Sequence, residues 1–314
     1  MERKTTPKNL LLKCLFIFPS LIVLVLTLIT VPIYAGKSVV SRDKTLTAAF
    51  LMTEKKLSES ERSIQPRHEG IIFDTSHADE GSFSVAVNTR SDRRIKLCIQ
   101  KDNGQNIYYE LPNNGTAVSF PFSEGNGTYS LIIYEKVSDA ADESKYTLLQ
   151  QHSCEVVLKD EFVPFLQPSF YVNYSSSSLC SLTASRICDG AVTDREKASR
   201  IVDYLIAVMS YQATEEKDSS KQYISDPDAV LLRQTGICLD YATLAAAMLR
   251  SQGIPTKVAY GTLSSEGSSS FHAWNIVYLE DQGWRLLDLV MLDSNYTSEQ
   301  IKEEFVYTPS GQYY

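Results

Sequence analysis

The spacing of hydrophobic residues changes once along this 314-residue chain, and that change constrains the fold more than any other feature. Between residues 71 and 159 the apolar residues form short runs, many of them alternating with polar residues. After residue 190 they recur at the spacing of a helix. The sequence therefore predicts an α+β protein, with a β-rich half followed by a half that contains helices.

Six runs in the first half have the length and composition of β-strands. Glycine- and asparagine-containing turns separate several of them, as at Asp102-Asn103-Gly104. Short strands at this spacing are typical of an antiparallel β-sandwich, which we place at residues 71–160. The six runs lie at residues 83–87, 95–99, 107–111, 117–122, 129–134 and 154–158.

The first 36 residues predict a secretion signal or a membrane anchor. Basic residues precede Cys14, and no charged residue occurs from there to Gly36, a length close to the ~20 residues that cross a bilayer. Either residues 14–35 remain as an anchor, or cleavage near Ala35 releases the chain. Both alternatives predict an extracytoplasmic location for the residues after Gly36, with the polar residues 37–70 as a stalk.

The overall charge and the cysteine spacing exclude two classes of protein. The 38 acidic residues outnumber the 30 basic ones, which disfavours binding to nucleic acid. The six cysteines and four histidines show no metal-ligand spacing, so we expect neither a metal nor a cofactor. Nothing in the sequence indicates an oligomeric state.

Five cysteines follow the N-terminal segment, and an odd number leaves at least one unpaired within the chain. Two alternatives remain open: two disulfides with Cys238 free, or five reduced thiols. The five are Cys98, Cys154, Cys180, Cys188 and Cys238.

Residues 161–189 contain two prolines and a run of serines, and predict a linker. Helix signals begin after it. Thr193 with Glu196 three residues later forms the pattern of a capping box, and Asp226 before Pro227 marks a second helix start.

A third helix is predicted to begin near Cys238, because an Ala- and Leu-rich stretch runs from there to Gly253. The positive end of a helix favours an anion, so a thiolate at this position would serve as a nucleophile at neutral pH. The alternative is an inert buried cysteine, which is common in proteins.

A β-hairpin is predicted downstream, with strands at residues 271–279 and 284–290. His272 opens the first strand, and Asp288 lies in an apolar part of the second, where a carboxylate needs a partner. The two share a face only if the connecting loop has an odd number of residues or contains a bulge. A three-residue loop at 280–282 would place Asp288 diagonally from His272. The Ser- and Gly-rich residues 264–270 before His272 predict a flexible loop that could act as a lid.

Three segments in this half, residues 236–242, 272–274 and 284–288, resemble the motifs of the transglutaminase-like superfamily of papain-like cysteine enzymes. The resemblance covers about residues 190–295 and implies a transglutaminase-like domain at 190–314, with a helix-borne cysteine packed on an antiparallel sheet. It implies that Cys238 is the nucleophile, His272 the general base and acid, and Asp288 the residue that orients His272. The whole layout resembles bacterial extracytoplasmic transglutaminase-domain proteins.

The resemblance implies acyl transfer through a thioester on protein or cell-wall peptide amides, by hydrolysis, deamidation or crosslinking. One departure stands out, because Leu289-Val290 follow Asp288 where the family usually has Pro-Thr. The departure leaves open a catalytically weak or inactive fold that serves as a surface binding or scaffold module. A purely structural surface protein is the remaining alternative.

Overall fold

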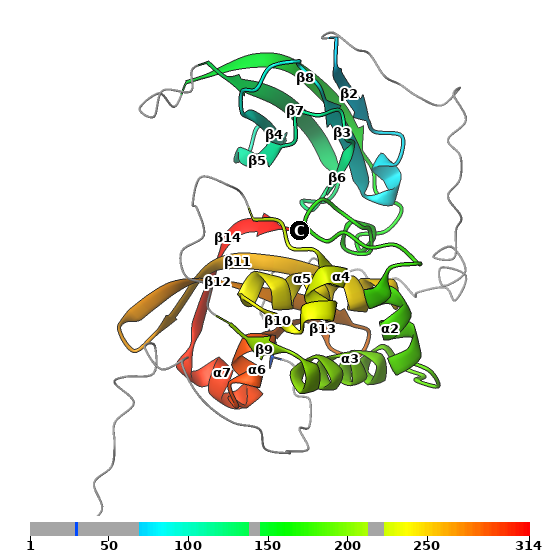
Figure 1. The fold of residues 1–314 in the computed structure, drawn as a ribbon, viewed down its shortest axis with the longest axis vertical. Helices are drawn as coiled ribbons and strands as arrows, with labels where there is room; N and C mark the ends of the chain where they lie inside the picture. The colour runs from blue at the N-terminus through cyan, green and yellow to red at the C-terminus, as the bar shows by residue number, and fades with distance from the viewer. Residues whose placement is uncertain (1–28, 31–68, 138–144, 213–222) are drawn as a thin grey trace, which may run out of the picture.

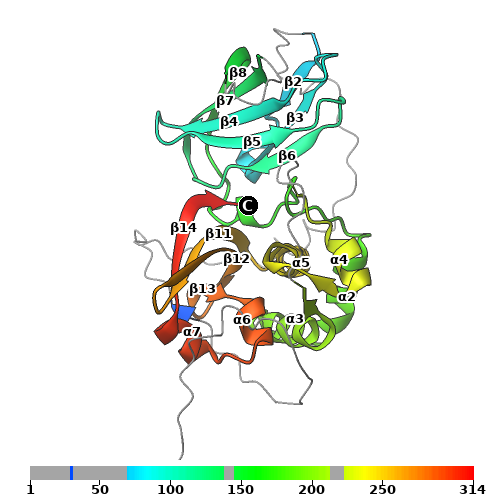
Figure 2. The same ribbon diagram turned by 60° about the vertical axis from the view of Figure 1, so that its left-hand side comes forward.

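The computed structural model describes residues 29–30, 69–137, 145–212 and 223–314. Figures 1 and 2 show two bodies, one built mainly of strands and one of helices packed against a sheet. The C-terminus lies between them, at the end of strand β14 (Val306–Tyr313). There the ring of Tyr314 stacks on Tyr171 and meets the edge of Tyr109 from the first body.

The first body is a sandwich of two antiparallel sheets, as predicted. The six predicted strands are confirmed, although the last one begins earlier than expected, and a further strand opens the body. One sheet has the order β2-β3-β6 and the other β5-β4-β7-β8. Their bounds are β2 (Ile71–Asp74), β3 (Ser82–Val87), β4 (Ile95–Lys101), β5 (Ile107–Leu111), β6 (Val118–Pro121), β7 (Gly127–Lys136) and β8 (Tyr146–Val156).

Alternation of side chains explains this sandwich. Phe83, Val85 and Val87 on β3 are buried, while the residues between them are partly exposed. Such a period of two places one face of the strand in the core. The turn after β4 holds Asp102 and Asn103 at φ 49° and 58°, a left-handed conformation that these residue types tolerate.

The second body packs helices against a five-stranded sheet of order β1-β13-β12-β11-β14. Helix α5 (Cys238–Ser251) lies at its centre, buried at every residue from Asp240 to Arg250. The other sheet strands are β1 (Ile29–Thr30), β11 (Thr256–Ser265), β12 (Ser268–Leu279) and β13 (Gly283–Leu287). The other helices are α2 (Leu179–Ile187), α3 (Asp194–Val208), α4 (Pro227–Arg233), α6 (Leu289–Asp293) and α7 (Ser298–Glu304). Two short strands, β9 (Ser210–Tyr211) and β10 (Thr235–Gly236), pair in parallel.

The predicted helix starts are confirmed. Thr193 caps α3, because its hydroxyl accepts a hydrogen bond from the Glu196 amide at 3.1 Å. Asp226 caps α4 through the amides of Asp228 and Ala229. Helix α5 ends at Ser251, just before Gly253, which adopts the left-handed φ of 79° that glycine permits.

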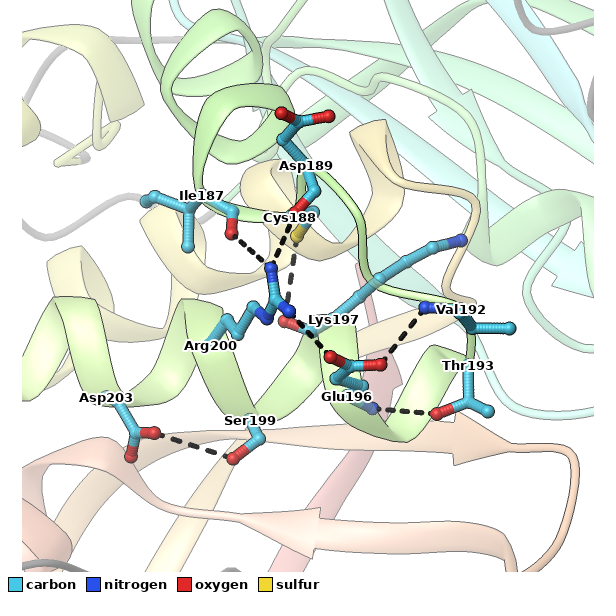
Figure 3. Close-up of polar contacts among 10 residues, drawn as sticks. All are labelled: Ile187, Cys188, Asp189, Val192, Thr193, Glu196, Lys197, Ser199, Arg200 and Asp203. Carbon is cyan, nitrogen blue, oxygen red and sulfur yellow. Dashed lines mark hydrogen bonds and ion pairs between the residues drawn. The ribbon is translucent and has the colours of Figure 1, made fainter.

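The expected linker at 161–189 contains helix α2, which packs against α5 in the helical layer. Arg200 fixes the turn between α2 and α3 (Figure 3). Its guanidinium donates to the Asp189 carbonyl at 2.6 Å and pairs with Glu196 at 2.6 Å. A helix end leaves several carbonyls without partners, and an arginine side chain here satisfies them.

The prediction of a flexible loop at residues 264–270 is wrong. Strands β11 and β12 continue through its serines and pair as far as Ser265 and Ser268. Only Glu266 and Gly267 form the turn, at φ 37° and 83°. Two left-handed residues make the hairpin turn whose twist matches that of the strands, so a composition typical of a loop is here a regular hairpin.

Two further expectations concern the N-terminus and the disulfides. No helix within the described residues is long and apolar enough to span a membrane. Ile29 and Thr30, inside the expected membrane segment, pair with β13, and the rest of that segment and nearly all of the expected stalk lie outside the described residues. Of the two alternatives left open for the cysteines, the structure agrees with the second, since all five cysteines of the described chain are free thiols.

Candidate active site

Cys238 is the first residue of α5 and follows Ile237, whose extended backbone begins the helix. Its side chain is only partly buried. The unpaired amides of a helix N-terminus favour an anion, so the position suits a thiolate.

The other four described cysteines have a different environment. Burial raises the pKa of each of these thiols, to about 11 for Cys154 and to about 12 for Cys180. The pKa values of Cys98 and Cys188 are also raised by burial. These four thiols therefore stay protonated and unreactive at neutral pH.

The hairpin that carries His272 has the predicted three-residue loop. Its second strand is shorter than predicted, because β13 ends at Leu287 and Asp288 is the N-cap of α6. Leu279 pairs with Gly283, which places residues 280–282 in the turn. In this register Asp288 continues the line opposite Trp274 and is thus diagonal to His272, as predicted. Gly283 adopts φ 72°, a left-handed conformation at the corner that favours glycine.

His272 is buried, and its Nε2 is 2.7 Å from Asp288 Oδ2. The Cys238 side chain is near enough to contribute to the pKa of the ring. Burial lowers the pKa of His272, but hydrogen bonds and charge attraction from Asp288 and Cys238 outweigh it, and the pKa is raised to about 10. The imidazolium form is therefore favoured at neutral pH.

Asp288 uses both carboxylate oxygens. Oδ1 accepts hydrogen bonds from the amides of Val290 and Met291 and so caps α6. Oδ2 accepts one from His272 and one from the Tyr307 hydroxyl, each at 2.7 Å. A buried carboxylate with four donors is held in one orientation, which in turn fixes the imidazole ring.

Tyr307 is a residue of the site that the sequence interpretation missed. It lies on β14, and its ring meets the edge of the Trp274 ring at 5.1 Å. Burial, together with the neighbouring Asp288, raises the pKa of Tyr307 well above its usual value, so the hydroxyl remains a donor. No motif around Tyr307 signals this role, because β14 pairs with β11 only through the tertiary fold.

Gly261 makes the approach of β14 feasible. A Cβ atom at this position would lie 2.1 Å from the Thr308 carbonyl oxygen. Only glycine allows the two backbones to come so close, and Tyr307 depends on that contact to reach Asp288.

The two residues after Asp288, where the sequence departs from the usual family motif, lie inside the protein. Leu289 and Val290 are 3% and 7% exposed and pack α6 into the core. They therefore stabilise the element that Asp288 caps.

The site holds no cluster suited to a metal. Across residues 69–137, 145–212 and 223–314 no group of three His, Cys, Asp or Glu side chains could hold an ion. The chemistry that the arrangement offers is that of a nucleophile beside a base, with a carboxylate behind the base.

Comparison with known proteins gives one family match. Residues 182–289, which include all three side chains, match the model of the transglutaminase-like superfamily. No curated protein matches the sequence.

Solved structures give more distant likenesses. A candidate cysteine protease from Cytophaga hutchinsonii is 17% identical, with 67% of this chain and 71% of that chain covered and a TM-score of 0.36. The periplasmic domain of TgpA from Pseudomonas aeruginosa is 14% identical, with 76% and 75% covered and a TM-score of 0.36. A red sea bream transglutaminase is 14% identical, with 66% and 48% covered and a TM-score of 0.27. Likenesses at these TM-scores add no argument to the family match.

Proposed function

We propose that this chain, whose residues 182–289 form a transglutaminase-like domain, is a cysteine enzyme that transfers acyl groups from amides through a thioester. One observation carries the proposal: the imidazole of His272 is hydrogen-bonded to Asp288, and the thiol that begins α5 is near enough to contribute to its pKa. Nucleophile, base and orienting carboxylate in a row are the parts that this chemistry needs.

In the first step, the Cys238 thiolate attacks the carbonyl carbon of an amide, and a carbon–sulfur bond forms. The proposed donor to the oxyanion is the backbone N–H of Cys238 at the helix start. The carbon–nitrogen bond then breaks as the His272 imidazolium gives its proton to the departing amine or ammonia. Asp288 stabilises the imidazolium throughout and keeps the ring in position.

In the second step, water or an amine attacks the thioester carbon and passes a proton to His272. The carbon–sulfur bond breaks and the thiolate is restored. Water gives hydrolysis of a peptide bond or deamidation of a glutamine, while a lysine amine gives a crosslink. The outcome depends on whether an amine or water occupies the site when the thioester forms.

The proposed substrate is an extracytoplasmic protein or cell-wall peptide. Support comes from the basic residues before Cys14 and the uncharged stretch after it, which are typical of export or anchoring. Fractionation of cells that express the full chain, followed by protease treatment of intact cells, tests this location. Protection of the chain in the cytoplasmic fraction would contradict it.

A glutamine-rich protein mixture and a labelled primary amine test the activity. The full chain and Cys238→Ala are incubated with both, and mass spectrometry measures incorporated amine, deamidated glutamine and new peptide ends. We expect at least one product that depends on Cys238. If the two proteins behave alike, and Cys238 alkylates only at alkaline pH, the chain is a binding or scaffold module instead.

A further inference from the structure

A second buried carboxylate lies at the start of α5, and it takes no part in the proposed reaction. Asp240 is two residues beyond Cys238, and its side chain is 3% exposed. Burying an ionised carboxylate is costly unless it is paired and hydrogen-bonded, so its surroundings need an explanation.

Four donors surround the Asp240 carboxylate. Oδ1 accepts hydrogen bonds from the hydroxyls of Tyr223 at 2.6 Å and Ser225 at 2.7 Å. Oδ2 accepts one from the Ile237 amide at 3.0 Å and is 2.9 Å from the Arg233 guanidinium. The donors come from three places: the segment before α4, the end of α4, and the residue that precedes Cys238.

The Ile237 contact connects this cluster to the nucleophile. This amide belongs to the Gly236–Ile237 peptide, one residue before Cys238, so Asp240 fixes the backbone that leads into the residue carrying the thiol. Gly236 shows how closely the groups fit, because a Cβ atom there would lie 2.5 Å from Asp240 Cβ and 2.7 Å from Oδ2. The turn before Cys238 is therefore shaped around this carboxylate.

The carboxylate also creates an electrostatic conflict. Asp240 and a Cys238 thiolate are two anions within the same first turn of a helix, and like charges destabilise each other. The cations that face this turn are Arg233 from α4 and the imidazolium of His272 from β12. Since His272 pairs with the thiolate, Arg233 is the cation left to neutralise Asp240.

We propose that Asp240 and Arg233 act as a positioning pair for Cys238: the carboxylate fixes the peptide before the thiol, and the guanidinium removes the charge that would otherwise oppose the thiolate. The proposal rests on the proposed function, because it concerns the ionisation of the same nucleophile. Neither residue touches the reacting atoms.

Arg200 provides a matched control arginine (Figure 3). Its side chain is 37% exposed against 39% for Arg233, and each pairs with one carboxylate and donates to a backbone carbonyl. Arg200 contacts α2 and Glu196, and no contact of the described structure joins it to Cys238 or Asp240. Its loss should lower stability without changing the thiol.

The test is the rate of iodoacetamide modification of Cys238 against pH, located by peptide mass spectrometry in the full chain. We expect Arg233→Met to move the midpoint of the profile upward by about one pH unit, and Arg233→Lys to leave it near the wild-type value. The double variant Arg233→Met with Asp240→Asn removes both charges and should return most of the shift. Arg200→Met should leave the midpoint unchanged.

Two different failures are distinguishable. If wild-type Cys238 reacts near neutral pH but Arg233→Met has the same midpoint, the pair is only structural and the positioning proposal is overturned. If wild-type Cys238 is itself unreactive until alkaline pH, the proposed function fails first. Arg233→Gln, which keeps a donor for the Thr235 carbonyl, gives the same reading if Arg233→Met does not fold.

Discussion

The two bodies of this molecule bury very different groups. Across the described residues of the sandwich, at 71–137 and 145–156, no charged side chain is buried, and its core consists of aliphatic and aromatic residues. Among the described residues of the helix-containing body, four acidic or basic side chains are buried, those of Asp240, Arg250, His272 and Asp288. Because buried charge is costly, the difference shows where the chain keeps polar groups for positioning and where it needs only packing.

Arg250 shows that burial of charge alone does not mark a catalytic residue. It is fully buried, and its guanidinium donates to the backbone carbonyls of Thr256, Gln167 and Tyr314. Burial lowers its pKa, to about 10, and it remains a cation at neutral pH. Arg250 thus links α5 to the connection that precedes α2, at Gln167, and to the C-terminal residue Tyr314. This role is structural.

The largest expected effect is a loss of stability that is confined to the sandwich. Leu97 is fully buried on β4, and Leu97→Ala should lower the free energy of unfolding by about 3 kcal/mol through lost burial and a cavity. Urea denaturation followed by circular dichroism measures the loss. The alkylation rate of Cys238 in the folded variant should equal that of the wild type; a tenfold fall would mean that the sandwich shapes the site.

The next effect concerns the carboxylate behind the imidazole. Asp288→Asn keeps an oxygen for capping α6 but removes the charge, so we expect the alkylation rate of Cys238 at pH 7 to fall about 30-fold. Stopped-flow or timed mass spectrometry measures it, with circular dichroism as a check on folding. An unchanged rate would show that His272 needs no orienting charge.

The pKa of His272 predicts a pH dependence of stability. Because this pKa is raised to about 10 in the folded chain, against about 6.5 unfolded, its contribution is fully present below pH 6.5 and is lost as the pH rises toward 10. The wild type should therefore lose stability relative to His272→Gln as the pH rises from 6 to 10. Paired urea titrations test this, and a constant difference between the two proteins would contradict it.

The smallest expected effect comes from the loss of the hydrogen bond between Tyr307 and Asp288. Tyr307→Phe removes one of the four donors to Asp288 while it preserves the ring that packs on Trp274. We expect about a fivefold fall in Cys238 reactivity, equivalent to about 1 kcal/mol for one hydrogen bond. Tyr313→Phe, on the same strand, is the matched control and should have no effect. Equal rates for both variants would remove Tyr307 from the site.

Local patterns predicted much of this fold. The strands of the sandwich, the caps at Thr193 and Asp226, and the three-residue hairpin loop all follow from alternation, capping residues and turn glycines. These signals depend on residues close together in the chain, so a sequence reveals them.

The remaining features depend on contacts between distant segments. Tyr307 reaches Asp288 because β14 crosses Gly261, and Arg233 reaches Asp240 because α4 packs beside α5.

The prediction of a loop at residues 264–270 was wrong for a different reason. Serine is common in loops, but the Glu266-Gly267 turn let the serines pair as strands.

The reactivity of one thiol tests the central claim most directly. Iodoacetamide rates at Cys238, resolved by residue and measured from pH 5 to pH 10, are compared between the full chain and His272→Ala. The account predicts fast modification of Cys238 at pH 7, slow modification of the other four described cysteines, and a loss of about 100-fold at Cys238 in His272→Ala. Slow modification of Cys238 at pH 7 that is the same in both proteins would contradict it.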